Sequence, residues 1–171
     1  MNWHSPDYYA EKSVQESVSA TADLIQYIQA LPLSQAQEPL VHPIITPRFA
    51  ISCTPELLAE LGRLAEMMPD VAIQTHISEN EKEVEDTLKY FTAESYASIY
   101  DKFKLLRHNT ILAHGVWLTE KEMDLIARKG ASISHCPTSN FYLSSGIARV
   151  GMLLDRGIKV WHVCVIHLKI T

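Results

Sequence analysis

The chain has 171 residues, enough for one globular domain with a substantial core, and its 47% hydrophobic and 20% charged residues are typical of a soluble protein. This composition argues against disorder and against a membrane protein, and the apolar stretch 158–170 contains two lysines and two histidines, so no bilayer span is expected. A net charge of −5 with scattered Lys and Arg argues against nucleic acid as a partner.

The first 42 residues contain several prolines and polar residues around one predicted helix, Val14 to Ala30, which Pro32 closes. From Pro43 onward, short apolar stretches alternate with amphipathic ones, a pattern typical of parallel βα units. The predicted strands are 44–51, 71–77, 110–116, 131–135 and 158–166.

The helices between these strands have recognisable ends. Thr54–Pro55 predicts an N-cap followed by proline at the first helical position, for a helix that runs to Met68. Ser78 with Glu81, and Thr119 with Glu122, have the spacing of capping boxes. Gly130 is expected to end a helix in the left-handed conformation.

Five strands that each lead into a helix fit either an open doubly wound sheet or part of a (β/α)8 barrel. No glycine-rich phosphate loop follows a strand, which favours the barrel. We therefore predict an α/β fold, a partial (β/α)8 TIM barrel with about five of the eight βα units. Residues 1–42 are expected to be a lead-in that belongs to the barrel, 43–160 the partial barrel itself, and 161–171 a divergent tail.

The three cysteines, Cys53, Cys136 and Cys164, are widely spaced and form no C-x-x-C pair. We expect them to be reduced and mostly buried. No secretory signal is visible at the N-terminus, so a cytoplasmic location is expected.

Active sites of parallel α/β folds lie beyond the carboxyl ends of the strands. At one such end stand His76 and, three residues later, Glu79. A neutral imidazole can bind zinc, and a nearby carboxylate can move the proton of an activated water. By spacing alone, a core histidine beside a helix start capped by Ser78 is about as good an interpretation.

Three further motifs have weaker signals when each is taken alone. The strand at 110–116 ends in His114–Gly115, which suits close approach to the backbone. His135 and Asn140 are interpreted as side chains that satisfy backbone groups of a loop, and Cys136 lacks the P-C-x-x-C context of one class of zinc deaminases. Arg48–Phe49 offers planar donors and an aromatic face to a flat base, although a salt bridge beside a core aromatic is an equal alternative.

Taken together, the motifs TPRF, THISEN, LAHG and SHCPTSN, in this order, resemble guanine deaminases of the amidohydrolase superfamily. The resemblance implies zinc-dependent hydrolysis of guanine to xanthine and ammonia in purine catabolism, by a homodimeric enzyme. It implies that His76 is a zinc ligand and that Glu79 and His114 are catalytic, with Glu79 moving protons. It also implies that Arg48, Phe49, His76 and Glu79 contact the purine.

The resemblance leaves parts of the family pattern unmatched, as in a chain truncated at both ends. The first-strand H-x-H pair has no counterpart, and the stretch that should hold the last aspartate ligand reads Trp161 to His167 without an acid. His162 and Cys164 are expected to be buried strand residues rather than ligands. We therefore expect the chain alone to be inactive and its zinc binding to be doubtful.

Two alternatives remain open. One is a related hydrolase that acts on another base. The other is a non-catalytic partner of full-length deaminase subunits, which associates with them through unpaired strand edges.

Overall fold

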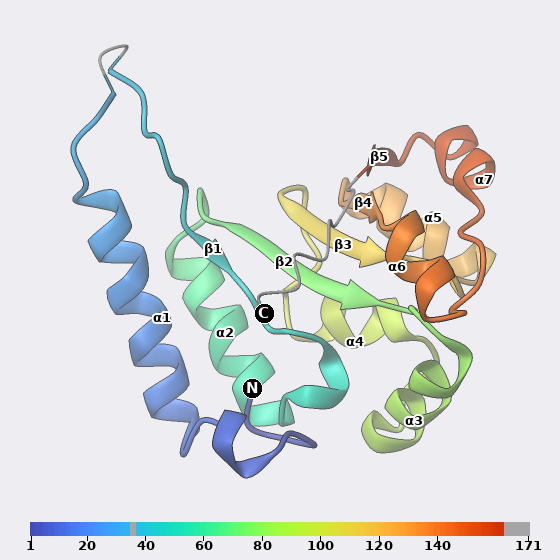
Figure 1. The fold of residues 1–171 in the computed structure, drawn as a ribbon, viewed down its shortest axis with the longest axis horizontal. Coiled ribbons are helices and arrows are strands. Elements are labelled where there is room, and N and C mark those ends of the chain that lie inside the picture. Colours follow the sequence, from blue (N-terminus) through green and yellow to red (C-terminus); the bar gives the residue numbers. More distant parts are fainter. Residues whose placement is uncertain (35–36, 163–171) are drawn as a thin grey trace.

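Five parallel strands in chain order form the sheet at the centre of the structure, a computed structural model that describes residues 1–34 and 37–162 (Figure 1). They are β1 (Ile44–Ile45), β2 (Ala72–Ile77), β3 (Thr110–His114), β4 (Ser132–His135) and β5 (Lys159–His162). Each strand pairs in parallel with the next. The predicted α/β fold with parallel βα units is confirmed.

Helical segments connect the strands. α1 lies on the side of the sheet where β1 is the outer strand, and α7 lies on the side where β5 is the outer strand (Figure 1). The α-helices are α1 (Val14–Gln29), α2 (Pro55–Met67), α3 (Glu81–Phe91), α4 (Tyr96–Lys102), α5 (Glu120–Lys129), α6 (Pro137–Tyr142) and α7 (Val150–Asp155). Two short 3-10 turns, η1 (Asp7–Tyr9) and η2 (Ala50–Ser52), precede α1 and α2. Within the described ranges, no helix combines the length and apolar character needed to cross a membrane.

The two faces of the sheet differ in exposure. Side chains that point toward the helices, such as Ile45, Ile73 and Leu112, are fully buried and form the core. On the other face Gln74 is exposed and Trp161 is 61% exposed. Because successive strand residues alternate between faces, one face builds the core, and the other carries half-buried residues together with these exposed side chains.

Several predicted helix ends are confirmed. The Thr54 hydroxyl accepts a hydrogen bond from the Leu57 amide at 3.3 Å, and Thr119 with Glu122 forms a capping box. Gly130 ends α5 with φ of 70°, in the left-handed region.

The predicted capping box at Ser78 and Glu81 is wrong. Asn80 is the N-cap of α3, and its side chain accepts a hydrogen bond from the Glu83 amide at 2.9 Å, while the Glu83 carboxylate accepts one from the Asn80 amide. Ser78 lies before the helix with φ of 49°, and its hydroxyl is buried without a hydrogen-bond partner. The helix start therefore shifts by two residues and leaves Glu79 in the connection between β2 and α3.

The predicted strands at 44–51 and 110–116 are too long. After Ile45 the chain leaves the ladder, since Pro47 has no amide to donate, and residues 50–52 form η2. β3 ends at His114 because His114 and Gly115 both have positive φ, 74° and 61°. The predicted strand at 158–166 is seen from Lys159 to His162, and residues 163–166, Cys164 included, lie outside the described part of the chain.

Because of the turn at Gly115, we expect alanine substitutions at Gly115 and at Gly151 to change the free energy of unfolding in opposite directions. A Cβ at Gly115 would lie 3.1 Å from Leu118 and 3.3 Å from Ile133 at a left-handed φ, whereas one at Gly151 meets nothing within 4 Å. Gly115→Ala should lower the free energy of unfolding by about 1–2 kcal/mol or more. Gly151→Ala, inside α7, should raise it by up to about 1 kcal/mol. Urea denaturation of the two variants checks this, and equal effects would contradict it.

Candidate functional site

A cluster of two histidines and a carboxylate lies at the carboxyl ends of β2 and β3. The rings of His76 and His114 are stacked, with centroids 5.2 Å apart and planes at 20°. The Glu79 carboxylate lies 3.6 Å from Nδ1 of His114, and the two side chains are 19% and 5% exposed. The expected convergence of these three residues at one edge of the sheet is therefore seen.

The left-handed backbone at His114 helps to form this cluster. In the strand register His76 pairs with Ala113 and Ile77 pairs with His114, so regular alternation would place the His114 ring on the helix side with Ile77. Instead φ is 74° at His114, and its ring stacks on that of His76. A positive φ at a residue other than glycine is uncommon and gathers at functional sites.

Hydrogen bonding fixes which nitrogen of His76 is free. Nδ1 of His76 lies 2.6 Å from the carbonyl oxygen of Arg48. Because a carbonyl only accepts, Nδ1 must donate, and Nε2 keeps its lone pair in the neutral ring. Burial lowers the pKa of His76, which favours that neutral form. This is the state of an imidazole that binds a metal through Nε2.

Asn140 belongs to the same cluster. It is 1% exposed, and its side-chain oxygen lies 2.8 Å from Nδ1 of His114. Its amide nitrogen and one carboxylate oxygen of Glu79 are buried and have no hydrogen-bond partner among the residues that the structure describes. The interpretation of Asn140 as a side chain that satisfies loop backbone is therefore wrong. Its position a few residues after a predicted strand end indicated this region of the sheet but not the partner His114.

His135 also departs from the expectation. Within the described part of the chain its buried Nδ1 has no hydrogen-bond partner, so this nitrogen does not satisfy a backbone group there. Its ring centroid lies 6.1 Å from that of His162, which is exposed at the end of β5 rather than buried as expected.

Arg48 and Phe49 border a cavity beside this cluster. The Phe49 ring lies 5.6 Å from that of His76, and the Arg48 guanidinium lies between the rings of Tyr9 and Phe49, 6.0 Å and 5.8 Å from their centroids. A cavity of about 430 Å3 is lined by Tyr9, Arg48 and Phe49 and by other residues of the N-terminal segment, including Met1. Tyr9 was not singled out from the sequence, because nothing in a single sequence relates residue 9 to residue 48.

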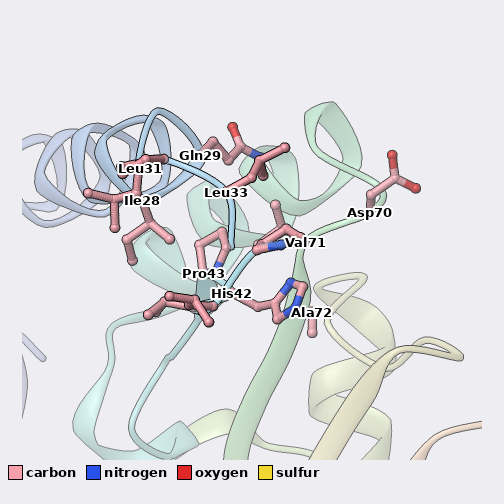
Figure 2. A pocket seen from close by; sticks show the side chains of 13 residues that line it. Ile28, Gln29, Leu31, Leu33, His42, Pro43, Asp70, Val71 and Ala72 are labelled. Carbon is pink, nitrogen blue, oxygen red and sulfur yellow. The ribbon is translucent and has the colours of Figure 1, made fainter. Parts of the chain in front are cut away.

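A second cavity, of about 600 Å3, lies at the other end of the sheet (Figure 2). Ile28 and Leu31 at the end of α1, Pro43 before β1, and Val71 beside the start of β2 are among its lining residues. These are the amino ends of the strands, away from the histidines. Since parallel α/β enzymes place their chemistry at the carboxyl ends, this cavity is not the candidate active site.

Two buried tyrosines of α4, Tyr96 and Tyr100, form hydrogen bonds to residues next to the cluster and to the backbone of His76. The Tyr100 hydroxyl accepts from the Ala50 amide at 2.9 Å and donates to the His76 carbonyl at 2.7 Å. Burial raises the pKa of Tyr100, so the hydroxyl keeps its proton. One turn earlier the Tyr96 hydroxyl donates to Glu83 at 2.6 Å, and Glu83 accepts from the Glu79 amide at 2.9 Å.

A metal site can be judged from the donor set. His76, neutral and with Nε2 free, suits a zinc ligand, and the buried unpartnered oxygen of Glu79 suits a proton acceptor beside it. Within residues 1–34 and 37–162, however, no group of three or more His, Cys, Asp or Glu is placed to hold an ion. Among the described residues, His76 could therefore supply one ligand to a metal ion, and no group of three such residues stands beside it.

A parallel sheet with histidines and a carboxylate at the carboxyl ends of its strands is the arrangement in which (β/α)8 barrel proteins place their active sites. The chain belongs to the amidohydrolase family, whose model matches residues 3–165.

Its relatives include guanine deaminases. The probable guanine deaminase of Schizosaccharomyces pombe is 50% identical over 161 residues, which are 94% of this chain and 30% of the relative. That of Dictyostelium discoideum is 44% identical over 94% of this chain and 34% of its own length. A crystal structure of guanine deaminase from C. acetobutylicum with bound guanine superposes with a TM-score of 0.85 at 35% identity, over 95% of this chain and 37% of that one. The expected resemblance is confirmed, and the chain spans about a third of the length of these relatives.

Loss of the Tyr100 hydroxyl should destabilise the fold. In Tyr100→Phe the buried Ala50 amide loses its acceptor, and we expect the free energy of unfolding to fall by about 1–3 kcal/mol. The control Tyr27→Phe removes a hydroxyl from a side chain that is 65% exposed and should change stability by less than about 0.5 kcal/mol. Chemical denaturation followed by circular dichroism measures the free energy of unfolding of both variants. An unchanged free energy of unfolding in Tyr100→Phe would contradict the assigned contacts.

The lowered pKa of His76 predicts a pH dependence. Because the folded state binds the proton less well than the unfolded state, the contribution of His76 is complete above the ordinary pKa of about 6.5 and declines as the pH falls below it. Stability in chelator-treated buffer should therefore fall from pH 7.5 to 5.5, and less so in His76→Gln. NMR titration of the His76 ring is the direct measurement, and a pKa at or above about 6.5 would refute the prediction.

Proposed function

We propose that this chain contributes the substrate-binding and proton-transfer part of a zinc-dependent guanine deaminase, which converts guanine and water to xanthine and ammonia. The observation that carries the proposal is the cluster of His76, Glu79 and His114 beside Arg48 and Phe49. The guanine deaminases among the relatives support the choice of guanine.

In this proposal each side chain has a role that its surroundings support. Glu79 takes a proton from the attacking water and delivers it to the amine nitrogen as the C–N bond breaks and the C–O bond forms. His114, held at Nδ1 by Asn140, presents Nε2 to the water or the substrate. Arg48 donates hydrogen bonds to the purine edge, and Phe49 packs on its face.

Zinc, when bound, would lower the pKa of the water toward neutrality, with Nε2 of His76 as one of its ligands. A catalytic zinc takes about three protein ligands, and the described residues do not gather three. We therefore propose that the chain alone is inactive. A cytoplasmic location, a role in purine catabolism and association with full-length or second subunits are further proposals that rest on the family alone.

A segment exchange tests the function. Residues 3–162 of this chain would replace the matching segment of the S. pombe relative, and xanthine formation from guanine would be followed by absorbance, with adenine and cytosine as competing substrates. We expect the chimera to turn over guanine and the isolated chain to show no turnover. Glu79→Gln in the chimera should lower kcat by about 10²–10⁴-fold.

The control is Glu81→Gln, which changes an exposed carboxylate in the first turn of α3 and should leave turnover unchanged. Full activity of the Glu79→Gln chimera would refute the proton-transfer role. A folded chimera that prefers another base would refute the assignment of guanine, and turnover by the isolated chain would refute its inactivity.

A further inference from the structure

His135 and His162 lie opposite each other at the carboxyl ends of β4 and β5. They are register partners in the parallel ladder, so their side chains leave neighbouring strands on the same face. Their ring centroids are 6.1 Å apart and the planes meet at 77°, an edge-on arrangement rather than a stack. The edge of one ring is therefore turned toward the other ring, at a centroid distance of 6.1 Å.

The His135 ring has an unmet hydrogen-bonding requirement. Among residues 1–34 and 37–162 its buried Nδ1 finds no hydrogen-bond partner, a state that costs free energy in a native protein and calls for an explanation. Burial and the neighbouring His162 and His114 lower the pKa of His135, which favours the neutral ring. A neutral imidazole offers a lone pair, and metal ligation is one way to give that nitrogen a partner.

We infer that His135 and His162 form a two-histidine site for a divalent transition metal ion such as Ni2+, Cu2+ or Zn2+. Imidazole ligands suit these ions, and water fills the other coordination positions. His162 is exposed, so the ion can enter from solvent. With two protein ligands, the site differs from a closed structural zinc site of four. It uses neither His76 nor Glu79, and it does not depend on the proposed deaminase function.

Nickel titration of the whole chain by calorimetry tests the inference. We expect saturable binding of Ni2+ that weakens at least about tenfold, or 1.4 kcal/mol, in both His135→Gln and His162→Gln. One control variant should bind as the unsubstituted chain does: His108→Gln, at an exposed histidine elsewhere on the surface. In NMR spectra, paramagnetic Ni2+ should broaden the ring signals of His135 and His162 before those of His108.

Three results would overturn the inference. The chain could bind no nickel, binding could persist in His135→Gln or His162→Gln, or it could be lost only in His76→Gln, which would place the ion at the other cluster. Because guanine turnover is measured on the chimera without added nickel, failure here leaves the deaminase proposal unaffected. The converse also holds, since nickel binding requires no substrate.

Discussion

The site depends on one buried hydroxyl that joins two separate parts of the chain. Arg48 and Phe49 follow β1, and His76 lies near the end of β2, so their relative position is set where the two segments meet. The Tyr100 hydroxyl bonds the Ala50 amide on one side and the His76 carbonyl on the other, inside a core where water cannot compete. The ring nitrogen of His76 then bonds the Arg48 carbonyl at 2.6 Å. The backbone and the side chain of His76 are thus both held in place relative to Arg48 and Phe49.

Backbone strain at the strand ends complements this hydrogen bonding. Ser78 after β2 and His114 at the end of β3 both have positive φ, which costs of order 1–3 kcal/mol for each residue that is not glycine. The surrounding contacts compensate: the Ser78 carbonyl accepts from the amides of Val116 and Trp117, both at 3.0 Å. Strain and polar contacts therefore lie in the same few residues, next to the side chains that the proposed reaction uses.

The sequence predicted the fold better than the details of the site. Apolar periodicity and cap residues located α1, α2 and α5, because those signals are local. The strand ends were missed at Ile45 and His114, since departures from the ladder arise from proline and from left-handed turns that tertiary contacts impose. The partnership of Asn140 with His114 joins residues 26 positions apart, and no spacing rule in a single sequence reveals it. The sequence did indicate that His76, Glu79 and His114 lie together, because the carboxyl ends of parallel strands lie side by side.

The short first strand has a consequence for self-association. β1 is an edge of the sheet, has two residues, and lies between Pro43 and Pro47, neither of which can donate an amide hydrogen. A foreign strand that approached this edge would find too few consecutive donors and acceptors to extend a ladder. Growth of fibrils by addition of strands at β1 is therefore disfavoured by the covalent structure of this segment.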